Sequence, residues 1–410
     1  MFESALMRQY ATAAGLSEAT LIVNTCAVTR EAERQARQAI RRLKREQPDM
    51  QIIVTGCAAH LNPESFTAMP EVNRVLNNAE KLLAENWRGE ESNSSASRPG
   101  QTVTSHNSRL LLSEFAERTR AFLPVQQGCN HRCTFCTIPL TRGPSRSLSP
   151  AQVVAQACAL TTAGYRELVL TGIDLTAYGL DLSADDSSEN ARYGVGRLIE
   201  KLLMEVPGLE RLRLSSLDPA EIEEELFAIF GADRRCMPHI HLSIQAGDDL
   251  ILKRMKRRHS RADVIQVTRR LQALRPEMTL GADFIVGFPT ESEVMFTNTL
   301  RLVAECGLTH LHIFPFSVRP GTAAARMPAV ASTIVQERAA RLRAVAAESL
   351  ASLLACRVGT LADVLLEKPN FGYSEDYLPV RLSSTAVPGT IVRVRLATAT
   401  ATDLHGDILP

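Results

Sequence analysis

Residues 128–139 read GCNHRCTFCTIP, and this stretch places Cys129, Cys133 and Cys136 within eight positions. The thiols are separated by three residues and then by two, and no fourth cysteine follows nearby. A structural zinc ion usually has four ligands, commonly two separated cysteine pairs. Ordinary iron–sulfur carriers also use four cysteines. A cubane cluster held by only three thiolates keeps one iron free to bind a substrate or cofactor directly.

His131 lies inside the same loop and could complete a zinc site. The residue pattern alone therefore leaves two readings of the loop. One is a three-thiolate cluster with an open iron, and the other is zinc. The dense packing of the three cysteines directly after a predicted strand favours the cluster.

The loop follows the first of six apolar segments that alternate with helical ones. The predicted strands are 122–127, 167–171, 211–215, 239–244, 280–286 and 308–314. Helical stretches lie near 150–163, 195–205, 219–230, 261–275, 291–305 and 332–354. Six such units predict a partial (β/α)6 barrel, because a full eight-unit barrel would need two more. In such a barrel the chemistry takes place at the carboxyl ends of the strands.

The chain on either side of the barrel predicts two smaller domains, so the fold class is α/β with an added all-β part. Before the barrel, helices and short apolar strands alternate, which is typical of a doubly wound parallel sheet. After it, short β-type runs separated by turns predict a small all-β barrel. The expected boundaries are 1–87 for the first domain, 88–108 for a Ser-, Gly- and Asn-rich linker, 115–355 for the barrel and 356–410 for the β domain.

The composition limits where in the cell the protein can be expected and which partners it can bind. Charge is balanced, with 46 Lys and Arg against 45 Asp and Glu, so a polyanion would have to meet local basic patches. We expect no secretion leader and no membrane partner, because no positively charged apolar leader or long apolar run is present. Nine cysteines in a chain of this kind indicate metal binding, catalysis or core packing rather than a disulfide framework. The expected location is cytoplasmic.

The CxxxCxxC spacing of Cys129, Cys133 and Cys136 closely resembles the signature of radical S-adenosylmethionine (SAM) enzymes. The resemblance implies that these residues ligate a 4Fe-4S cluster whose open iron chelates SAM. It also implies that the loops after the barrel strands hold SAM. The residues expected there are Ser215, Ser216, Ser243, Gln245 and Gly287.

Cys26 and Cys57 each end a predicted parallel strand, so they share the sheet edge where ligands bind. Their contexts, NTCAVT and TGCAAH, resemble the cluster domain of the methylthiotransferases within the radical SAM enzymes. That family implies a second 4Fe-4S cluster with a third cysteine at the end of an earlier strand. Here the chain opens with the helix that would follow that strand. We therefore expect a truncated N-terminus, with one cluster secure and the second lacking a ligand.

Three segments resemble one branch of that family: NTCAVT, LTGIDLTAYG and FPFSVRPGTAAARMP. The branch adds a methylthio group to carbon 2 of N(6)-threonylcarbamoyladenosine next to the tRNA anticodon. Two sister functions remain as alternatives, namely methylthiolation of isopentenyladenosine in tRNA and of a ribosomal protein. A non-catalytic, zinc-containing RNA-binding protein is the alternative from a different class.

RNA binding needs basic patches, and two are present. The run LKRMKRRHSR (252–261) follows the fourth barrel strand, and further arginines lie in the β domain. The candidate RNA contacts are Lys253, Arg254, Lys256, Arg257, Arg258, Arg381, Arg393 and Arg395. An aromatic content of 5% argues against extensive base stacking. The expected partners are the tRNA anticodon region and an electron donor, and we expect a monomer.

Overall fold

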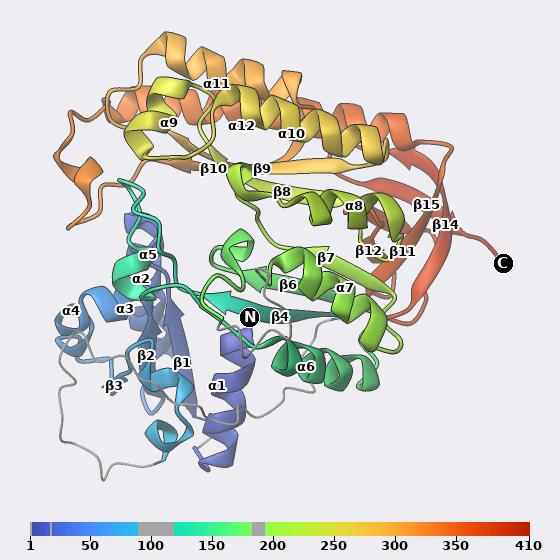
Figure 1. Ribbon diagram of the computed structural model, residues 1–410. Coiled ribbons are helices and arrows are strands. Elements are labelled where there is room, and N and C mark those ends of the chain that lie inside the picture. The colour runs from blue at the N-terminus through green and yellow to red at the C-terminus, as the bar shows by residue number, and fades with distance from the viewer. Residues whose placement is uncertain (1, 17–18, 89–118, 183–192) are drawn as a thin grey trace. The chain divides into compact units, whose positions relative to one another are not determined.

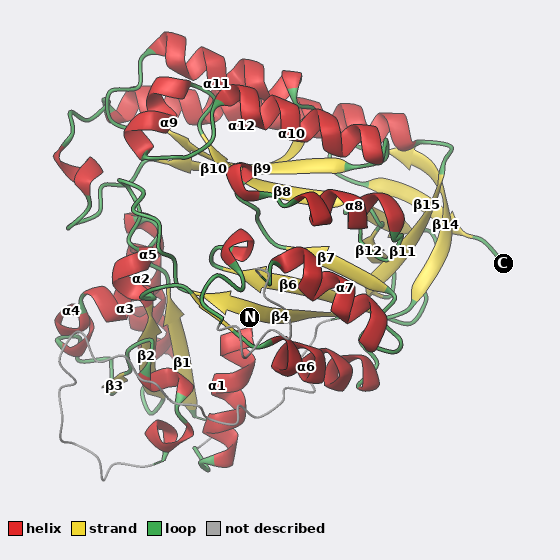
Figure 2. Cartoon of the chain, in the orientation of Figure 1, coloured by secondary structure: helices red, strands yellow, loops and turns green. Residues whose placement is uncertain are grey.

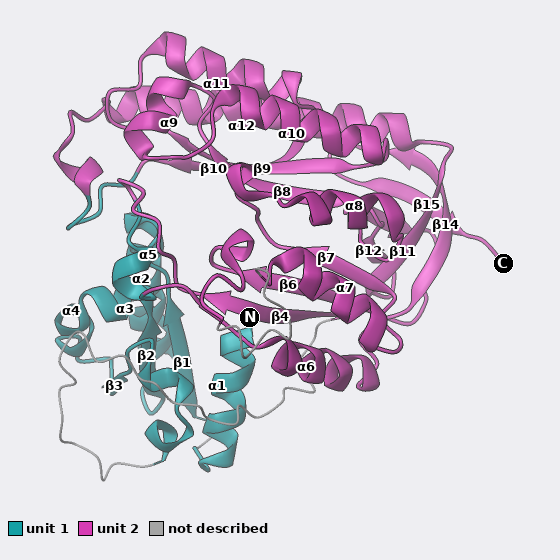
Figure 3. Ribbon diagram, in the orientation of Figure 1, with its two compact units in different colours: residues 1–112, 136–143, 317–322 teal, residues 113–135, 144–316, 323–410 magenta. Residues whose placement is uncertain are grey.

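The computed structural model describes residues 2–16, 19–88, 119–182 and 193–410. The expected linker 88–108 falls outside these ranges except for its first residue. The chain divides into two compact units (Figure 3). Unit 1 comprises residues 1–112, 136–143 and 317–322, and unit 2 comprises residues 113–135, 144–316 and 323–410.

Unit 1 is built on a parallel sheet in the order β1-β2-β3, as the alternation of helices and strands predicts. Its strands are β1 (Thr20–Thr25), β2 (Gln51–Gly56) and β3 (Arg74–Val75). Its helices are α1 (Phe2–Ala13), α2 (Arg30–Glu46), α3 (Cys57–Leu61) and α4 (Pro63–Thr67), followed by α5 (Ile138–Thr141). Helix α2 begins after Thr29, whose hydroxyl accepts a hydrogen bond from the Ala32 amide at 3.1 Å.

Residues 80–87 of unit 1 do not form a continuous helix. The segment forms two short 3-10 turns, η1 (Glu80–Leu82) and η2 (Ala84–Trp87). The Trp87 side chain is fully buried, and its indole N–H donates to the Lys81 carbonyl at 3.1 Å. A continuous helix would not bring these two groups together, so burial of the one tryptophan decides the local structure.

Unit 2 contains the six predicted parallel strands (Figure 1). They are β4 (Arg120–Gln127), β6 (Glu167–Gly172), β7 (Arg211–Leu214), β8 (His239–Gln245), β9 (Thr279–Val286) and β10 (Leu308–Pro315). The helices between and after them are α6 (Pro150–Thr162), α7 (Val195–Glu205), α8 (Glu224–Ala232), α10 (Arg261–Leu274), α11 (Glu293–Glu305) and α12 (Ser332–Arg357). Figure 2 shows the strands on the inside and the helices on the outside.

The barrel strands pair in two groups. Strands β4, β6 and β7 form one parallel group, which the short antiparallel β5 (Arg146–Ser147) extends, and β8, β9 and β10 form the other. Single bridges, Leu212 with Cys236 and Leu217 with Leu242, connect the region of β7 to that of β8. The partial barrel expected from the sequence is therefore confirmed, with its carboxyl ends at one rim.

One helix of unit 2 was not expected. Helix α9 (Asp249–Met255) occupies the start of the basic run after β8. It begins because the Asp248 carboxylate accepts hydrogen bonds from the amides of Leu250 and Ile251. It ends at Lys256, which adopts the left-handed conformation with φ of 59°.

The C-terminal segment of unit 2 forms a closed barrel in the order β11-β12-β13-β15-β14, as expected. Its strands are β11 (Leu361–Lys368), β12 (Phe371–Tyr373), β13 (Pro379–Leu382), β14 (Ile391–Ala399) and β15 (Leu404–Ile408). A core of Val364, Leu366, Val380, Val394 and Leu404 fills it. Within the described ranges, no helix is long and apolar enough to cross a membrane.

Candidate active site: the cysteine loop and the strand ends

The cysteine loop leaves β4 at Gly128, which adopts a φ of 74° that favours glycine. Gln126, the buried penultimate residue of β4, holds the loop start in place. Its amide nitrogen donates to the Gly128 carbonyl at 2.9 Å, and its carbonyl oxygen accepts from the Asp174 amide at 2.9 Å. A glutamine from the first strand thus ties the loop to the end of the next strand, β6.

The three loop thiols are not in disulfide bonds, and each accepts a hydrogen bond. The His131 amide donates to Cys129 Sγ at 3.4 Å, and the Ile138 amide donates to Cys136 Sγ at 3.4 Å. A guanidinium nitrogen of Arg257 donates to Cys133 Sγ at 3.7 Å. Donors directed at sulfur stabilise the thiolate form, which is the form that ligates metals.

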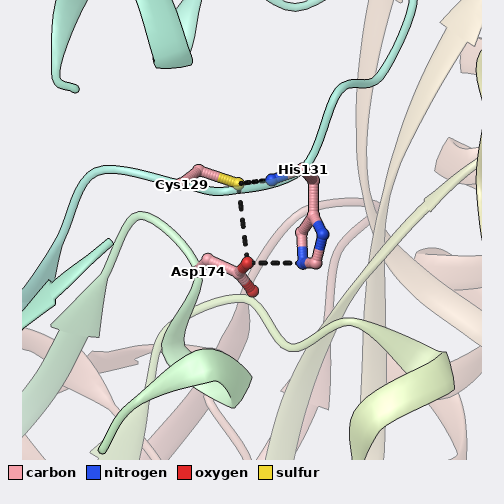
Figure 4. A group of neighbouring side chains, drawn as sticks. All are labelled: Cys129, His131 and Asp174. Carbon is pink, nitrogen blue, oxygen red and sulfur yellow. Dashed lines mark hydrogen bonds and ion pairs between the residues drawn. The ribbon is translucent and has the colours of Figure 1, made fainter. Parts of the chain in front are cut away.

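A second set of contacts joins the loop to Asp174, in the turn after β6 (Figure 4). Nε2 of His131 lies 2.7 Å from Asp174 Oδ2 and 3.6 Å from Glu221 Oε2, and Cys129 Sγ lies 3.5 Å from Asp174 Oδ2. The contacts with Asp174 and then Glu221 raise the pKa of His131 to about 9. The ion pair with Asp174 by itself accounts for the position of His131.

The end of α9 supports the loop from the other side. The Thr134 amide donates to the Met255 carbonyl at 3.1 Å, and the Thr134 hydroxyl donates to the Arg254 carbonyl at 2.8 Å. The left-handed turn at Lys256 is followed at once by Arg257, whose side chain is 8% exposed. The loop backbone is thus fixed by the C-terminus of a helix that the sequence pattern did not reveal.

Arg257 joins the cysteine loop to two strand ends. Besides Cys133, its guanidinium contacts Asp218 Oδ2 at 2.9 Å and the Ser243 carbonyl at 2.7 Å. Burial favours the neutral acid, but a hydrogen bond from His259 and the charge of Arg257 hold the pKa of Asp218 well below its usual range. Asp218 is therefore a carboxylate that keeps Arg257 in place.

Of the expected RNA contacts after β8, the arginines make contacts within the protein, whereas the lysines are exposed. Arg257 is buried against Cys133, and Arg258 pairs with Asp218 and Glu221. Arg254 reaches the Thr290 carbonyl at 3.4 Å. Lys253 and Lys256 are exposed. The structure therefore removes Arg257 from the surface, because its charge is used at the cysteine loop.

The expected SAM residues all lie at the carboxyl ends of barrel strands. Ser215 and Ser216 follow β7, Ser243 and Gln245 end β8, and Gly287 follows β9. Gln245 has a φ of 74° and Gly287 a φ of 72°, so the chain turns sharply at both places. A Cβ at Gly287 would lie 2.3 Å from Val335 of α12, so helix packing by itself accounts for the glycine.

Four residues of this site were not singled out from the sequence, namely Gln126, Asp174, Asp218 and Glu221, and Arg257 was expected only as an RNA contact. The signal available was the position of Asp174 and Asp218, because each acid follows a predicted strand within a few residues. Nothing in the local pattern connects Arg257 with Cys133, since 123 residues of chain lie between them.

The second pair of cysteines lies at the carboxyl edge of the unit 1 sheet. Thr25 pairs with Gly56 in register, so Cys26 and Cys57, the next residues, leave neighbouring strands at the same level. Gly56 has a φ of 101°, and a Cβ there would lie 2.2 Å from the Thr25 carbonyl oxygen. Glycine is therefore needed for the two strand ends to approach this closely.

Polar side chains surround the Cys57 thiol. Nε of Arg142 donates to Cys57 Sγ at 3.2 Å, and the Asn78 side-chain amide donates at 3.6 Å. Glu3 of α1 fixes Arg142 through an ion pair, and it also pairs with the buried Lys81 at 2.7 Å. Cys57 therefore lies beside a guanidinium, as Cys133 does in the cysteine loop.

Comparison with known proteins agrees with this geometry. Residues 123–303 match the radical SAM superfamily, and residues 1–77 match the uncharacterized protein family UPF0004. A radical SAM methyltransferase, TsrM from Kitasatospora setae, shares the fold with a TM-score of 0.52 at 16% identity, over 79% of this chain and 67% of that chain. The barrel and the three-thiol loop thus define a radical SAM protein.

Relatives found by sequence show to which family of radical SAM proteins the chain belongs. Threonylcarbamoyladenosine tRNA methylthiotransferase MtaB from Rickettsia prowazekii is 44% identical over 97% of this chain and 92% of its own length. MtaB from Bacillus subtilis is 33% identical over 92% of this chain and 85% of its own length. The tRNA-2-methylthio-N(6)-dimethylallyladenosine synthase from Jannaschia sp. is 31% identical over 95% and 86%. The chain belongs to the radical SAM methylthiotransferase family, and it is an enzyme of the transferase class.

Proposed function

We propose that the protein adds a methylthio group to carbon 2 of N(6)-threonylcarbamoyladenosine next to the anticodon of tRNA. The observation that carries the proposal is the 44% identity over nearly the whole chain to a relative named for this reaction. The relatives named for the dimethylallyladenosine reaction are 31% and 32% identical. The three-thiol loop supplies a full ligand set for one cluster, and the two strand-end cysteines in unit 1 supply two of the three ligands expected for the second.

The loop fits a 4Fe-4S cluster. Cys129, Cys133 and Cys136 are not in disulfide bonds, and each accepts a hydrogen bond, as cluster thiolates do. When bound, the cluster supplies the electron that cleaves SAM. The residues at the strand ends, Ser215, Ser216, Ser243, Gln245 and Gly287, would hold the SAM ribose, methionyl and adenine groups.

The protein's own residues prepare this site electrostatically. Arg257 places a buried positive charge against Cys133, and Asp218 holds that charge in one position. Asp174 and Glu221 hold His131 beside Cys129 and raise its pKa to about 9. The part of the loop that carries Cys129 and Cys133 is thus held by charged groups at both thiols.

Cys26 and Cys57 would ligate the second, sulfur-donating cluster. Their strands are parallel neighbours in register, which brings both thiols to one edge, and Arg142 and Asn78 donate to Cys57. Two thiols and nearby donors support metal binding at this edge.

Exposed Lys and Arg side chains of unit 2 would contact the RNA. Lys253 and Lys256 are exposed near α9, with Arg254 between them. In the C-terminal barrel, Arg381 of β13 and Arg393 and Arg395 of β14 are exposed, although Arg393 pairs with Asp363 at 2.9 Å and Arg381 with Asp403 at 3.4 Å. We infer that this barrel is a TRAM-type RNA-binding domain.

The proposal also covers the location, the oligomeric state, the electron donor and the domain boundaries of the protein. We propose a cytoplasmic monomer that receives electrons from a separate donor protein. The domain boundaries 1–87, 88–108, 115–355 and 356–410 stay part of the proposal, although the C-terminal strands belong to the same compact unit as the barrel.

The test is methylthiolation of tRNA by the cluster-loaded protein with SAM and a reductant. Nucleosides from digested tRNA should show 2-methylthio-N(6)-threonylcarbamoyladenosine, detected by mass spectrometry. The control is the same tRNA lacking the threonylcarbamoyl group, which should remain unmodified. A product formed only on isopentenyladenosine, or only on a ribosomal protein, would assign the chain to a sister function instead.

A further inference from the structure

Three side chains on the β8–β9–β10 sheet converge at a point that the proposed chemistry does not use. They are His241, Asp283 and His312, and their ligand atoms lie within 4.8 Å of one another. Nε2 of His241 lies 3.0 Å from Oδ1 of Asp283, and Nδ1 of His312 lies 3.0 Å from the same oxygen. Two imidazole nitrogens therefore flank one carboxylate oxygen.

The strand register explains the convergence. His312 of β10 pairs with Asp283 of β9, and His241 of β8 pairs with Gly281, two residues earlier on β9. Paired residues, and residues two positions apart, point to the same face of a sheet. A Cβ at Gly281 would lie 2.5 Å from Nδ1 of His241, so glycine leaves the space that the imidazole ring occupies.

The pKa of the Asp283 carboxyl group is strongly changed by its surroundings. Burial raises the pKa of Asp283, but hydrogen bonds from His241 and His312 outweigh it and lower that pKa to about 2. Within the described ranges, the ion pairs of Asp283 are with these two histidines, and no Lys or Arg is paired with it. Asp283 is therefore an ionised, mostly buried carboxylate. Its two neighbours are histidines, which commonly ligate metal ions.

Access and geometry also suit an ion. The side chains are 9% exposed for His241, 20% for Asp283 and 64% for His312, so the group opens to solvent on the His312 side. Ligand atoms about 2.0–2.2 Å from a tetrahedral zinc ion lie about 3.3 Å from each other. The two 3.0 Å contacts are close to that separation, so an ion could enter with small side-chain movements.

We propose that His241, Asp283 and His312 form a binding site for one divalent transition-metal ion, separate from the cysteine sites. Two imidazole nitrogens and one carboxylate oxygen are the donor set of open zinc sites, and the same set accepts other first-row divalent ions. Three protein ligands leave a further position for water or another oxygen ligand. None of the three residues has a role in the proposed function. Disproof of the metal site would therefore leave the proposed methylthiotransferase function unaffected, and the reverse also holds.

The test measures zinc on the full chain with its clusters loaded, so that the cysteines are occupied. After incubation with zinc and gel filtration, the wild-type protein should retain about one zinc ion per chain beyond the cluster iron. His312→Ala should weaken the affinity by about 100-fold or more, because loss of a ligand exceeds the 10–100-fold cost of losing a ligand's supporting partner. Asp283→Asn should do the same, and His405→Ala, a half-buried histidine of β15, should retain the ion.

X-ray absorption at the zinc edge identifies the ligands. Nitrogen and oxygen neighbours at about 2.0–2.2 Å, without sulfur at about 2.3 Å, are the expected result. A sulfur shell would place the ion at cysteines and would overturn the proposal. Equal zinc retention by wild type and His312→Ala, or none by wild type, would overturn it as well and leave a metal-free His–Asp–His hydrogen-bonded group.

Discussion

At the scale of single residues, the site depends on charges placed against sulfur. Arg257 lies against Cys133 and Arg142 against Cys57, and each cation is held by a carboxylate, Asp218 or Glu3. A fixed cation lowers the cost of collecting negative thiolates at one place. The guanidiniums therefore belong to the function of the cysteines as well as to the stability of the fold.

Arg257→Ala should make the loop cluster harder to reduce. Removing the cation leaves Asp218 as a buried negative charge near the thiolates, so an added electron is less favourable. We expect a more negative midpoint potential in an EPR-monitored titration and about 10-fold slower formation of 5′-deoxyadenosine.

Three further variants make the Arg257 test specific. Arg257→Lys should retain most of the potential because it keeps the charge. Cys133→Ala should abolish SAM cleavage, and Cys158→Ala should leave it unchanged. A midpoint potential that is the same in Arg257→Ala and wild type would show that Arg257 serves only the folding of the loop.

At the scale of elements, one buried ion-pair group links α1 to the segments that flank the unit 1 sheet. Glu3 of α1 pairs with Lys81 of η1, which is fully buried, and with Arg142 at the end of α5. Burial opposes ionisation, but hydrogen bonds and charges from Arg142 and Lys81 lower the pKa of Glu3 to about 2. A single carboxylate therefore compensates the charges of two largely buried cations.

Glu3→Gln should destabilise unit 1 at neutral pH by about 3 kcal/mol, because it leaves Lys81 buried without its counter-charge. The folded-state pKa lies below the ordinary value of 4.5, so this stability is present above pH 4.5 and is lost as pH falls toward 2. The difference between wild type and variant, measured by urea unfolding, should shrink over that window. A difference that does not change with pH would mean that packing, and not charge, explains the loss.

At the scale of the whole molecule, the balanced net charge of +1 means that RNA affinity rests on local cations. Arg393 and Arg395 alternate with the buried Val394 on β14, so both side chains face outward from the C-terminal barrel. An exposed strand with two outward arginines fits contact with the RNA backbone more than reading of bases.

Replacing both Arg393 and Arg395 with Ala should weaken tRNA binding and reduce its salt dependence. If each arginine contacts one phosphate, the slope of log affinity against log salt should decrease by about 2 for the pair. Filter binding across a salt series measures the slope. Arg234→Ala, which removes an arginine that is 85% exposed before β8, is the control and should leave the slope unchanged. An unchanged slope in the double variant would place the RNA elsewhere.

The local sequence determined the elements and the donor sets. The period of the apolar residues gave the six barrel strands and the parallel sheet of unit 1, because burial on one face imposes that period on the chain. The spacing of Cys129, Cys133 and Cys136 marked the functional loop, since three thiols this close along the chain can ligate one cluster without depending on the rest of the fold. Helix α9 was missed because its seven residues are too few to show a helical period clearly.

Tertiary structure alone decided which distant residues meet. Arg257 reaches Cys133 because Lys256 turns the chain into a left-handed conformation, and the His241–Asp283–His312 group exists because three strands align in one register. Register and a single backbone dihedral each depend on packing across the whole unit. A pattern of neighbouring residues reports the face of an element and its period, but not the partner that this face will meet.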